Sequence, residues 1–199
     1  RNSTGPAPVA KSRAAQQRHR GRALAAPQWA GSGGREALTA GDLELAAYHD
    51  GSAMPSVHAR RPYLHPVRAL GGRVISAAHP ENHRHQYGLS LAPPDVNGTS
   101  FWGGRTYVAG SGATLLPNHG RQVSLSREAD ADADGARLTE LLSWRTPDGD
   151  ELVSERRVLA ASLLPHGAGW VLTWRSELDA TGGDLTFRSP ALNGRPGAG

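Results

Sequence analysis

Short stretches of alternating apolar and polar residues, separated by glycine and proline, follow one another from about residue 43 onward. Alternation with a period of two places every second side chain on the same face of an extended strand. No window carries the 3.6-residue periodicity of a long amphipathic helix. The elements indicate an all-β protein, folded as an antiparallel β-sandwich. The predicted strands are 43–48, 63–70, 73–77, 87–91, 137–144, 151–159 and 169–178.

Two turns fix how neighbouring strands pair. Gly71-Gly72 separates the second and third predicted strands, and a two-residue glycine turn is a hairpin signal. Pro147-Asp148-Gly149 separates the fifth and sixth, and this tripeptide has the residue types that tight turns require. Both pairs of strands are therefore predicted to be antiparallel hairpins.

The N-terminal part of the chain lacks this pattern. Residues 1–37 are rich in alanine, glycine, proline and arginine, and we predict a disordered basic tail or linker followed by a folded domain at 38–199. Residues 1–35 hold seven Lys or Arg and no acid, which leaves 15 basic and 18 acidic residues, a net charge of −3, in the remainder. A basic tail can contact nucleic acid, but a leader or linker fits this composition better, so a nucleic-acid partner is not expected.

Composition narrows the chemistry further. The 199 residues include 25 Gly, 14 Pro and no Cys, which excludes disulfides, thiolate metal sites and cysteine nucleophiles. No apolar run reaches the ~18–20 residues that span a bilayer. We expect a soluble, cytoplasmic protein without a membrane partner.

Histidines are concentrated in one segment. His79, His83 and His85 fall within seven residues, and His65 lies upstream beside Tyr63. Imidazole is the commonest protein metal ligand and transfers protons near neutral pH. Alternate residues of an extended segment share a face, so His83 and His85 should point the same way. Three interpretations stay open: a site for Zn, Cu or Fe, a metal-free polar pocket, and a structural role.

Other polar and aromatic residues are weaker candidates. Glu155 can act as a general base if it is buried near a histidine, although an ion pair with a neighbouring arginine is the simpler interpretation. Asn97 and Trp102 can line a sugar pocket, where the indole stacks on the ring and the amide fixes a hydroxyl. Aromatic residues in such positions also commonly belong to the core.

Four blocks of sequence carry a resemblance to a known family. They are RPYLHPV at 61–67, HPENHRHQYGL at 79–89, DVNGTSFW at 95–102 and WRTPDGDELVSER at 144–156. In this order they resemble the PmoA-like family, named after a methane oxygenase subunit, over about residues 40–199. A chain without membrane spans is unlike the membrane-bound oxygenase, so the family name does not imply methane chemistry here.

The resemblance implies an architecture, a substrate class and a partner. A galactose-mutarotase-like supersandwich is the expected form of the sandwich. Family members accompany sugar oxidoreductases of the Gfo/Idh/MocA type, which implies a sugar substrate and such an oxidoreductase as partner. The family continues beyond the end of this sequence, so the domain is expected to be C-terminally truncated. The family usually has aspartate and histidine where this chain has Asn82 and Gln86.

The favoured function is a carbohydrate-processing enzyme with a histidine-rich pocket for proton transfer or metal-assisted chemistry. Two alternatives stay open: a non-catalytic sugar-binding module of a sugar oxidoreductase system, and a metal-dependent oxidoreductase. The predicted catalytic residues are His65, His83, His85 and Glu155, the substrate-binding residues are Arg61, Tyr63, Asn97 and Trp102, and the metal ligands are His79, His83 and His85.

Overall fold

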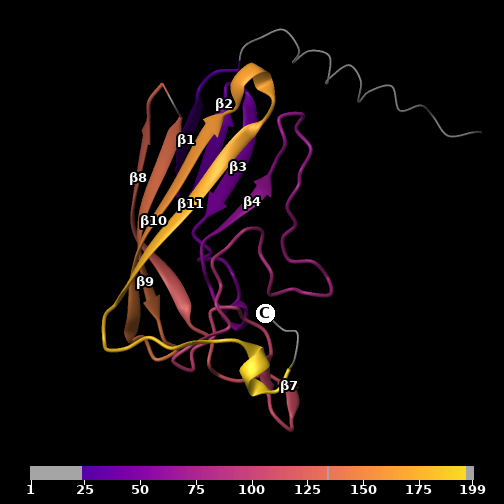
Figure 1. Ribbon diagram of the computed structural model, residues 1–199, viewed down its shortest axis with the longest axis vertical. Coiled ribbons are helices and arrows are strands. Elements are labelled where there is room, and N and C mark those ends of the chain that lie inside the picture. The colour runs from indigo at the N-terminus through magenta and orange to yellow at the C-terminus, as the bar shows by residue number, and fades with distance from the viewer. Residues whose placement is uncertain (1–23, 134, 196–199) are drawn as a thin grey trace, which may run out of the picture.

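Two four-stranded antiparallel sheets pack face to face and form the body of the protein (Figure 1). The computed structural model describes residues 24–133 and 135–195. The first sheet has the order β1-β2-β3-β4, formed by β1 (Pro27–Ser32), β2 (Arg35–Ala40), β3 (Leu43–His49) and β4 (Tyr63–Val67). The second has the order β11-β10-β9-β8, formed by β8 (Arg121–Ala131), β9 (Ala136–Arg145), β10 (Glu151–Leu163) and β11 (Trp170–Ala180).

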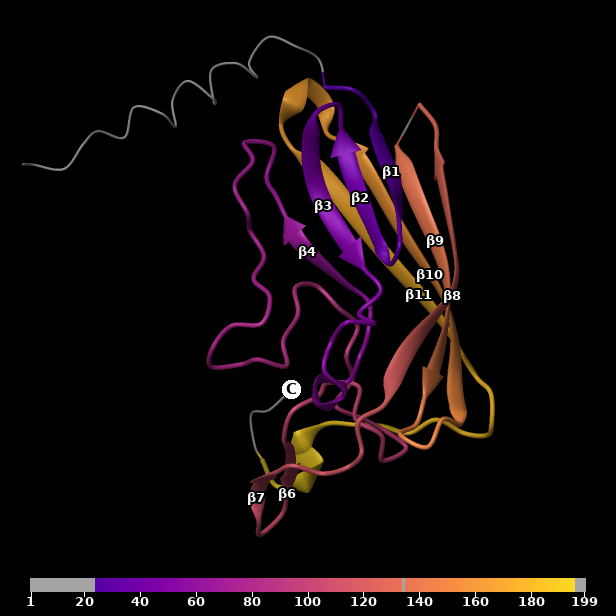
Figure 2. The same cartoon turned by 180° about the vertical axis from the view of Figure 1, so that it is seen from behind.

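Smaller elements complete the described chain. Two-stranded pairs are formed by β5 (Asp95–Val96) with β12 (Phe187–Arg188) and by β6 (Thr106–Val108) with β7 (Gly112–Thr114). Single 3-10 turns are η1 (Ser56–His58), η2 (Pro165–Gly167) and η3 (Pro190–Asn193). Figure 2 shows the long loops between β4 and β8 lying beside β4 and below the first sheet. Among the described residues, no helix is long and apolar enough to cross a membrane.

The prediction of an all-β antiparallel fold is confirmed. The clearest predicted hairpin is β9–β10, whose turn is closed by a hydrogen bond from the amide of Thr146 to the carbonyl of Asp150 at 2.9 Å. Alternation along β10 also holds, because its odd-numbered residues from Val153 to Ala161 are buried. The strand was therefore predicted, but apolar alternation does not identify its inward face, because the buried positions include the charged Glu155 and Arg157.

Four parts of the secondary structure differ from the predictions. The predicted strand at 87–91 forms only isolated bridges, from Tyr87 to Ala78 and from Leu89 to Leu64. Residues 24–37 are not a tail, because β1 and the start of β2 lie there and pair with each other; residues 1–23 lie outside the described part of the chain. The predicted strand at 73–77 forms only a single bridge between Arg68 and Val74. Strand β8 was not predicted, since its outer half is mostly exposed and charged and lacks a clear apolar alternation. Many residues of β1, β2 and β8 are small or charged, and pairing with a neighbouring strand stabilises their extended conformation.

The apolar core is divided into two clusters. The larger lies between the two sheets and combines Trp29, Leu38, Ala40, Leu45, Ala46, Tyr48, Leu64 and Val67 of the first sheet with Ala136, Leu138, Leu159 and Ala161 of the second. The smaller covers the lower half of the second sheet and combines Val96 and Phe101 from the loops with Leu142, Trp144 and Val153. The first sheet therefore covers only part of the second, and the loops after β4 cover the rest.

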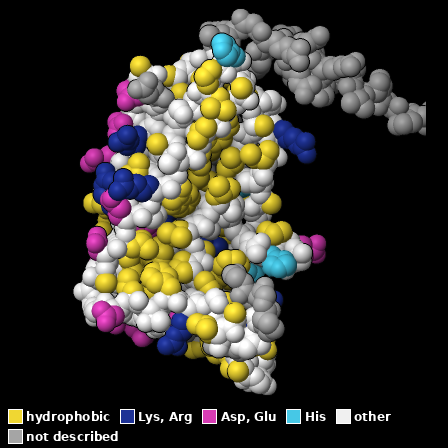
Figure 3. All heavy atoms as spheres, in the orientation of Figure 1, with side chains coloured by type: hydrophobic (Ala, Val, Ile, Leu, Met, Phe, Trp, Pro, Cys, Tyr) yellow, Lys and Arg dark blue, Asp and Glu magenta, His cyan; other side chains and the backbone are white. Residues whose placement is uncertain are grey.

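Apolar side chains also reach the surface along the edge strand β11. Figure 3 shows them gathered over this strand and beside it. Trp170, Leu172 and Trp174 pack half-buried against the larger cluster, while Val171 and Leu178 are exposed. This edge of the sandwich is less completely closed than the opposite one, where β1 packs against β8 and β9.

A buried ion pair occupies the inward face of β10 between the two apolar clusters. Arg157 donates from Nε and Nη2 to the two carboxylate oxygens of Glu155 at 2.8 and 2.7 Å, and both side chains are completely buried. Trp144 and Ser176 donate to the same carboxylate at 2.7 and 2.5 Å. The Glu155 carboxylate is fully hydrogen-bonded, as a buried charge must be.

The same arginine joins this pair to the first sheet. Its Nη1 donates to the hydroxyl of Tyr48 on β3 at 2.7 Å, and Tyr48 donates in turn to Glu140 at 2.5 Å. Arg127 donates to the other oxygen of Glu140 at 2.8 Å. Two arginines and two glutamates balance their charges, so the network joins both sheets without a net buried charge.

We expect Arg157→Met to destabilise the fold by about 3–5 kcal/mol, because it leaves the Glu155 carboxylate buried without its cation. The matched control is Arg156→Met on the outer face of β10, where an exposed pair with Glu177 at 3.5 Å should contribute about 0–1 kcal/mol. Urea unfolding of both variants gives the comparison. Equal losses for the two variants would contradict a special role for the buried pair.

Candidate functional site

Three loops meet at a buried arginine just before β4. Arg61 is 2% exposed, and its guanidinium donates five hydrogen bonds to groups on these loops. Because the bonds run to separate segments of the chain, this one side chain fixes the positions of all three loops. The acceptors are the carbonyls of His58 at 2.7 Å, Ala59 at 3.0 Å, Trp102 at 3.2 Å and His85 at 2.8 Å, together with the hydroxyl of Ser90 at 3.0 Å.

Arg61 has no acidic partner among the described residues. Burial lowers its pKa to about 10, so the guanidinium remains positively charged at neutral pH. Backbone carbonyl dipoles replace the water that a buried cation loses. Arg61, predicted to bind substrate, is thus buried, and its hydrogen bonds go to the protein's own loops; a contact of this residue with substrate stays a prediction.

Four aromatic and imidazole side chains form a cluster beside Arg61, which we name the imidazole–phenol cluster: His58, Tyr63, His79 and Tyr87. The Nδ1 atom of His58 lies 3.0 Å from the hydroxyl of Tyr87. The ring centroid of His79 lies 5.3 Å from those of both His58 and Tyr87, and Tyr63 and Tyr87 are 5.1 Å apart. The members come from η1, from β4 and from both ends of the 79–87 loop.

Two further histidines, His49 and His65, lie next to the cluster along the first sheet. His49 at the end of β3 stacks on Tyr63 with a centroid distance of 4.9 Å and an interplanar angle of 16°. Its Nε2 donates to the carbonyl of His65 at 2.9 Å, and Nδ1 of His65 lies 2.9 Å from the hydroxyl of Ser76. The predicted catalytic residue His65 therefore lies outside the imidazole–phenol cluster, with its ring against the hydroxyl of Ser76.

Burial favours the uncharged forms of His58, His85 and Tyr87. The pKa of His58 is lowered by burial and then by the charges of His79, His85, Arg61 and His119. Burial likewise lowers the pKa of His85 and raises that of the Tyr87 hydroxyl. At neutral pH His58 is thus an uncharged imidazole and Tyr87 an intact phenol, which are the forms that can accept and donate a proton.

The three predicted metal ligands do not come together. His79 donates through Nδ1 to the carbonyl of Arg84 at 2.5 Å and contacts His58 and Tyr87, as described above. His83 instead lies 6.0 Å from His85, whose ring lies 5.9 Å from Trp102. Across the described ranges 24–133 and 135–195, no group of three His, Asp or Glu side chains is arranged to hold a metal ion. Figure 3 shows histidines gathered where this loop projects from the body.

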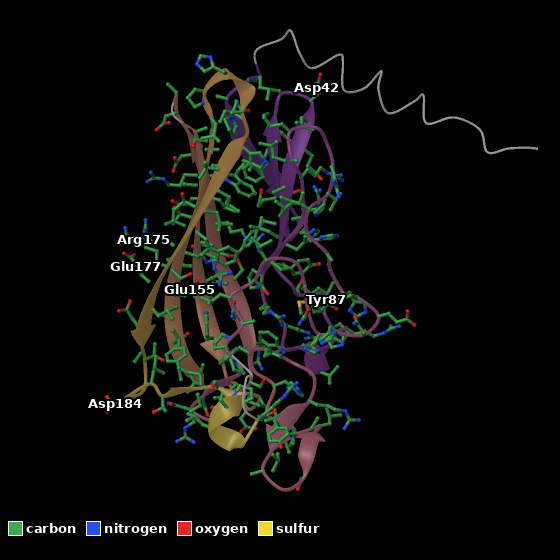
Figure 4. The ribbon with its side chains drawn as sticks, turned by 45° about the vertical axis from the view of Figure 1, so that its right-hand side comes forward. Asp42, Tyr87, Glu155, Arg175, Glu177 and Asp184 are labelled. Atoms are coloured by element: carbon green, nitrogen blue, oxygen red, sulfur yellow. The ribbon has the colours of Figure 1, made fainter. Side chains whose placement is uncertain are left out.

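Two further predicted site residues lie elsewhere. Figure 4 shows Glu155 on the second sheet, well separated from Tyr87 in the loops, so the predicted general base belongs to the interior network and has an arginine as its partner. Asn97 donates to the carbonyl of Asp184 at 3.0 Å and accepts from the amide of Thr186 at 2.8 Å. It therefore ties β5 to the segment before β12 and does not face the cluster.

The sequence prediction missed His58 and Tyr87, the central pair of the cluster. His58 is isolated in a loop, 21 positions before His79, and Tyr87 was assigned to a strand. Tyr63, a predicted substrate-binding residue, lies against His49 and Tyr87, and Trp102 lies beside His85 with 37% of its surface exposed. No local pattern predicts the approach of His58 to Tyr87, because the loops are brought together through Arg61.

Comparison with known proteins corrects the family assignment. Residues 35–197 match a family of unknown function, DUF6807, and the expected PmoA-like family is not found, so that resemblance was wrong. No curated protein matches the chain, and no solved structure does. The supersandwich form, the Gfo/Idh/MocA partner and the oxidoreductase alternative therefore stay predictions. The match covers most of the sequence, and the chain belongs to the DUF6807 family.

Proposed function

We propose that the imidazole–phenol cluster is an acid–base site that transfers protons on a sugar or a similar polyhydroxylated small molecule. The observation that carries this proposal is the 3.0 Å approach of His58 Nδ1 to the Tyr87 hydroxyl. The lowered pKa of His58 leaves its imidazole uncharged at neutral pH and the raised pKa of Tyr87 leaves its phenol protonated, so the first can accept a proton and the second can donate one.

The hydrogen bond between His58 and Tyr87 leaves one ring free to accept a proton and the other free to donate one. When Nδ1 of His58 carries its proton and donates it to the Tyr87 oxygen, Nε2 is left with a free lone pair. The phenolic proton of Tyr87 is then free for an oxygen of the substrate. His58 can remove a proton from a substrate carbon or hydroxyl while Tyr87 donates to the neighbouring oxygen, as epimerisation and elimination both require.

Aromatic surfaces around the cluster favour a sugar ring. Trp102 is partly exposed beside His85, and Tyr63 lies against Tyr87. Such rings offer an apolar face for the C–H face of a sugar and a polar edge for its hydroxyls. Arg61 holds the loops that carry His58, His85 and Trp102, so these groups do not need to be ordered when the ligand binds.

A non-catalytic sugar-binding module is the second candidate. None of the hydrogen bonds of the cluster described above joins an imidazole to a carboxylate, which is the group that commonly orients a catalytic histidine and stabilises its charged form. A site with this composition can bind hydroxyls without turning the ligand over. Saturable binding of a sugar without any exchange or turnover would favour this candidate.

We expect the native protein to exchange a carbon-bound or anomeric proton of a sugar with D2O, measured by NMR over a sugar panel. Tyr87→Phe and His58→Gln should each lower the rate by about 100-fold or more, since each removes one proton-transfer group. His166→Gln, in the exposed turn after β10, is the matched control and should retain the native rate. Native rates in both cluster variants would contradict the proposal.

The pH dependence of this activity follows from the lowered pKa of His58. Since only the neutral imidazole accepts a proton, the acid limb of kcat/KM should have its midpoint below the ordinary histidine value of about 6.5. An NMR titration of the His58 ring should give a midpoint on the same acid side of that value. An acid limb above pH 7, or one that persists in His58→Gln, would show that another group controls the reaction.

A further inference from the structure

A cavity of about 510 Å³ lies next to the imidazole–phenol cluster and shares the turn η1 with it. Ser56 and Val57 line the cavity, while the following residue, His58, belongs to the cluster. The volume is within the range of small-molecule sites. None of the sequence-predicted site residues lines this cavity, so its chemistry is separate from the predictions made above.

The charge of the lining is of one sign. Arg60, His119 and Arg121 line the cavity, and none of its lining residues is Asp or Glu. Neither arginine forms an ion pair within the described part of the chain. Apolar residues, among them Leu115 and Leu116, form other parts of the wall. Basic groups in a hollow with apolar walls concentrate anions, because the field is less screened than on an open surface.

Both arginines are oriented by the backbone and keep unused donors. Nε of Arg60 donates to the carbonyl of Met54 at 2.7 Å, and Nη1 of Arg121 donates to that of Thr146 at 3.3 Å. The terminal nitrogens of Arg60, and Nε and Nη2 of Arg121, form no hydrogen bond with the described residues. A guanidinium with free N–H groups matches the two oxygens of a carboxylate or phosphate.

His119 is the third basic side chain of the lining and links the cavity to the cluster. Its Nε2 donates to the carbonyl of Gly104 at 2.7 Å, which fixes the orientation of the ring. Gly104 is in turn bonded through its amide to the carbonyl of Val57 at 2.7 Å. The charge of His119 also contributes to the lowered pKa of His58, so an anion bound beside His119 acts on the same electrostatic field.

We propose that this cavity binds the carboxylate or phosphate group of a small molecule, held by Arg60 and Arg121 with His119 beside them. Combined with the proposed function, on which this second step rests, the substrate class is an acidic sugar: its anionic group enters the cavity and its ring reaches His58 and Tyr87. The apolar part of the lining contacts the carbon skeleton between them.

The test is calorimetric titration of the full chain with glucuronate, glucose 6-phosphate, inorganic phosphate and neutral glucose at low ionic strength. At least one of the two acidic sugars should bind saturably and at least about 10-fold more tightly than glucose, because a charge-assisted bidentate contact contributes that much or more. Tighter binding of glucuronate would indicate a carboxylate site, and tighter binding of glucose 6-phosphate would indicate a phosphate site. Glucose binding as tightly as both acidic sugars would overturn the proposal.

Paired variants locate the site. The double variant Arg60→Gln, Arg121→Gln should lose at least about 10-fold in affinity for the acidic sugar, whereas Arg137→Gln, an exposed arginine on β9, should not. Unchanged affinity in the double variant would overturn the proposal. If that variant does not fold, the native protein is titrated with the acidic sugar and followed by NMR. The amide signals of Leu116 and Gly120 should then shift. Shifts confined to other regions would overturn the proposal.

Failure of this inference is distinguishable from failure of the proposed function. Binding is measured without turnover, and Tyr87→Phe should leave the affinity for inorganic phosphate unchanged within about twofold, since Tyr87 does not line the cavity. Phosphate affinity lost in Tyr87→Phe but kept in the arginine double variant would move the anion site to the cluster and overturn the inference. Anion binding at the cavity without proton exchange on any sugar would support the inference and contradict the enzyme.

Discussion

The pairing of Arg157 with Glu155 in the middle of β10 is the constraint on which the sandwich depends. It lies where the first sheet ends and the loops begin to cover the second, and through Tyr48 it is bonded to both sheets. A buried ion pair is weak evidence for net stability, but its directional bonds are satisfied by only one arrangement. Together with the apolar cluster between the sheets, this network contributes directional contacts that connect β3 with β9 and β10.

Arg61 is also a buried cation, but different groups stabilise its charge. Arg157 is neutralised by glutamate, but Arg61 is surrounded by carbonyls and keeps an uncompensated positive charge. Burial lowers the pKa of His58 and His85, which lie on the loops that Arg61 holds, and the Arg61 charge adds to this effect. One side chain therefore both holds the loops of the imidazole–phenol cluster and adds to the preference of His58 for its neutral form.

The turn η1 connects the two proposed sites. Residues at its start line the basic cavity and its last residue, His58, belongs to the cluster, so the two cannot move independently by much. The excess of basic side chains on this side is local, since the chain beyond residue 35 is mildly acidic overall. The basic lining of the cavity is therefore a local feature, and a charge count over the whole chain does not reveal it.

The sequence by itself determined the class of fold, the β9–β10 hairpin and the region of the histidines, because side-chain alternation and turn chemistry are local properties. It did not determine β1 and β2, whose small residues form strands only when paired. It also left the role of Glu155 open, since burial beside Arg157 depends on the opposite sheet. Only the tertiary structure decided that His58 meets Tyr87, because residues 29 positions apart are joined by loops that Arg61 holds in place.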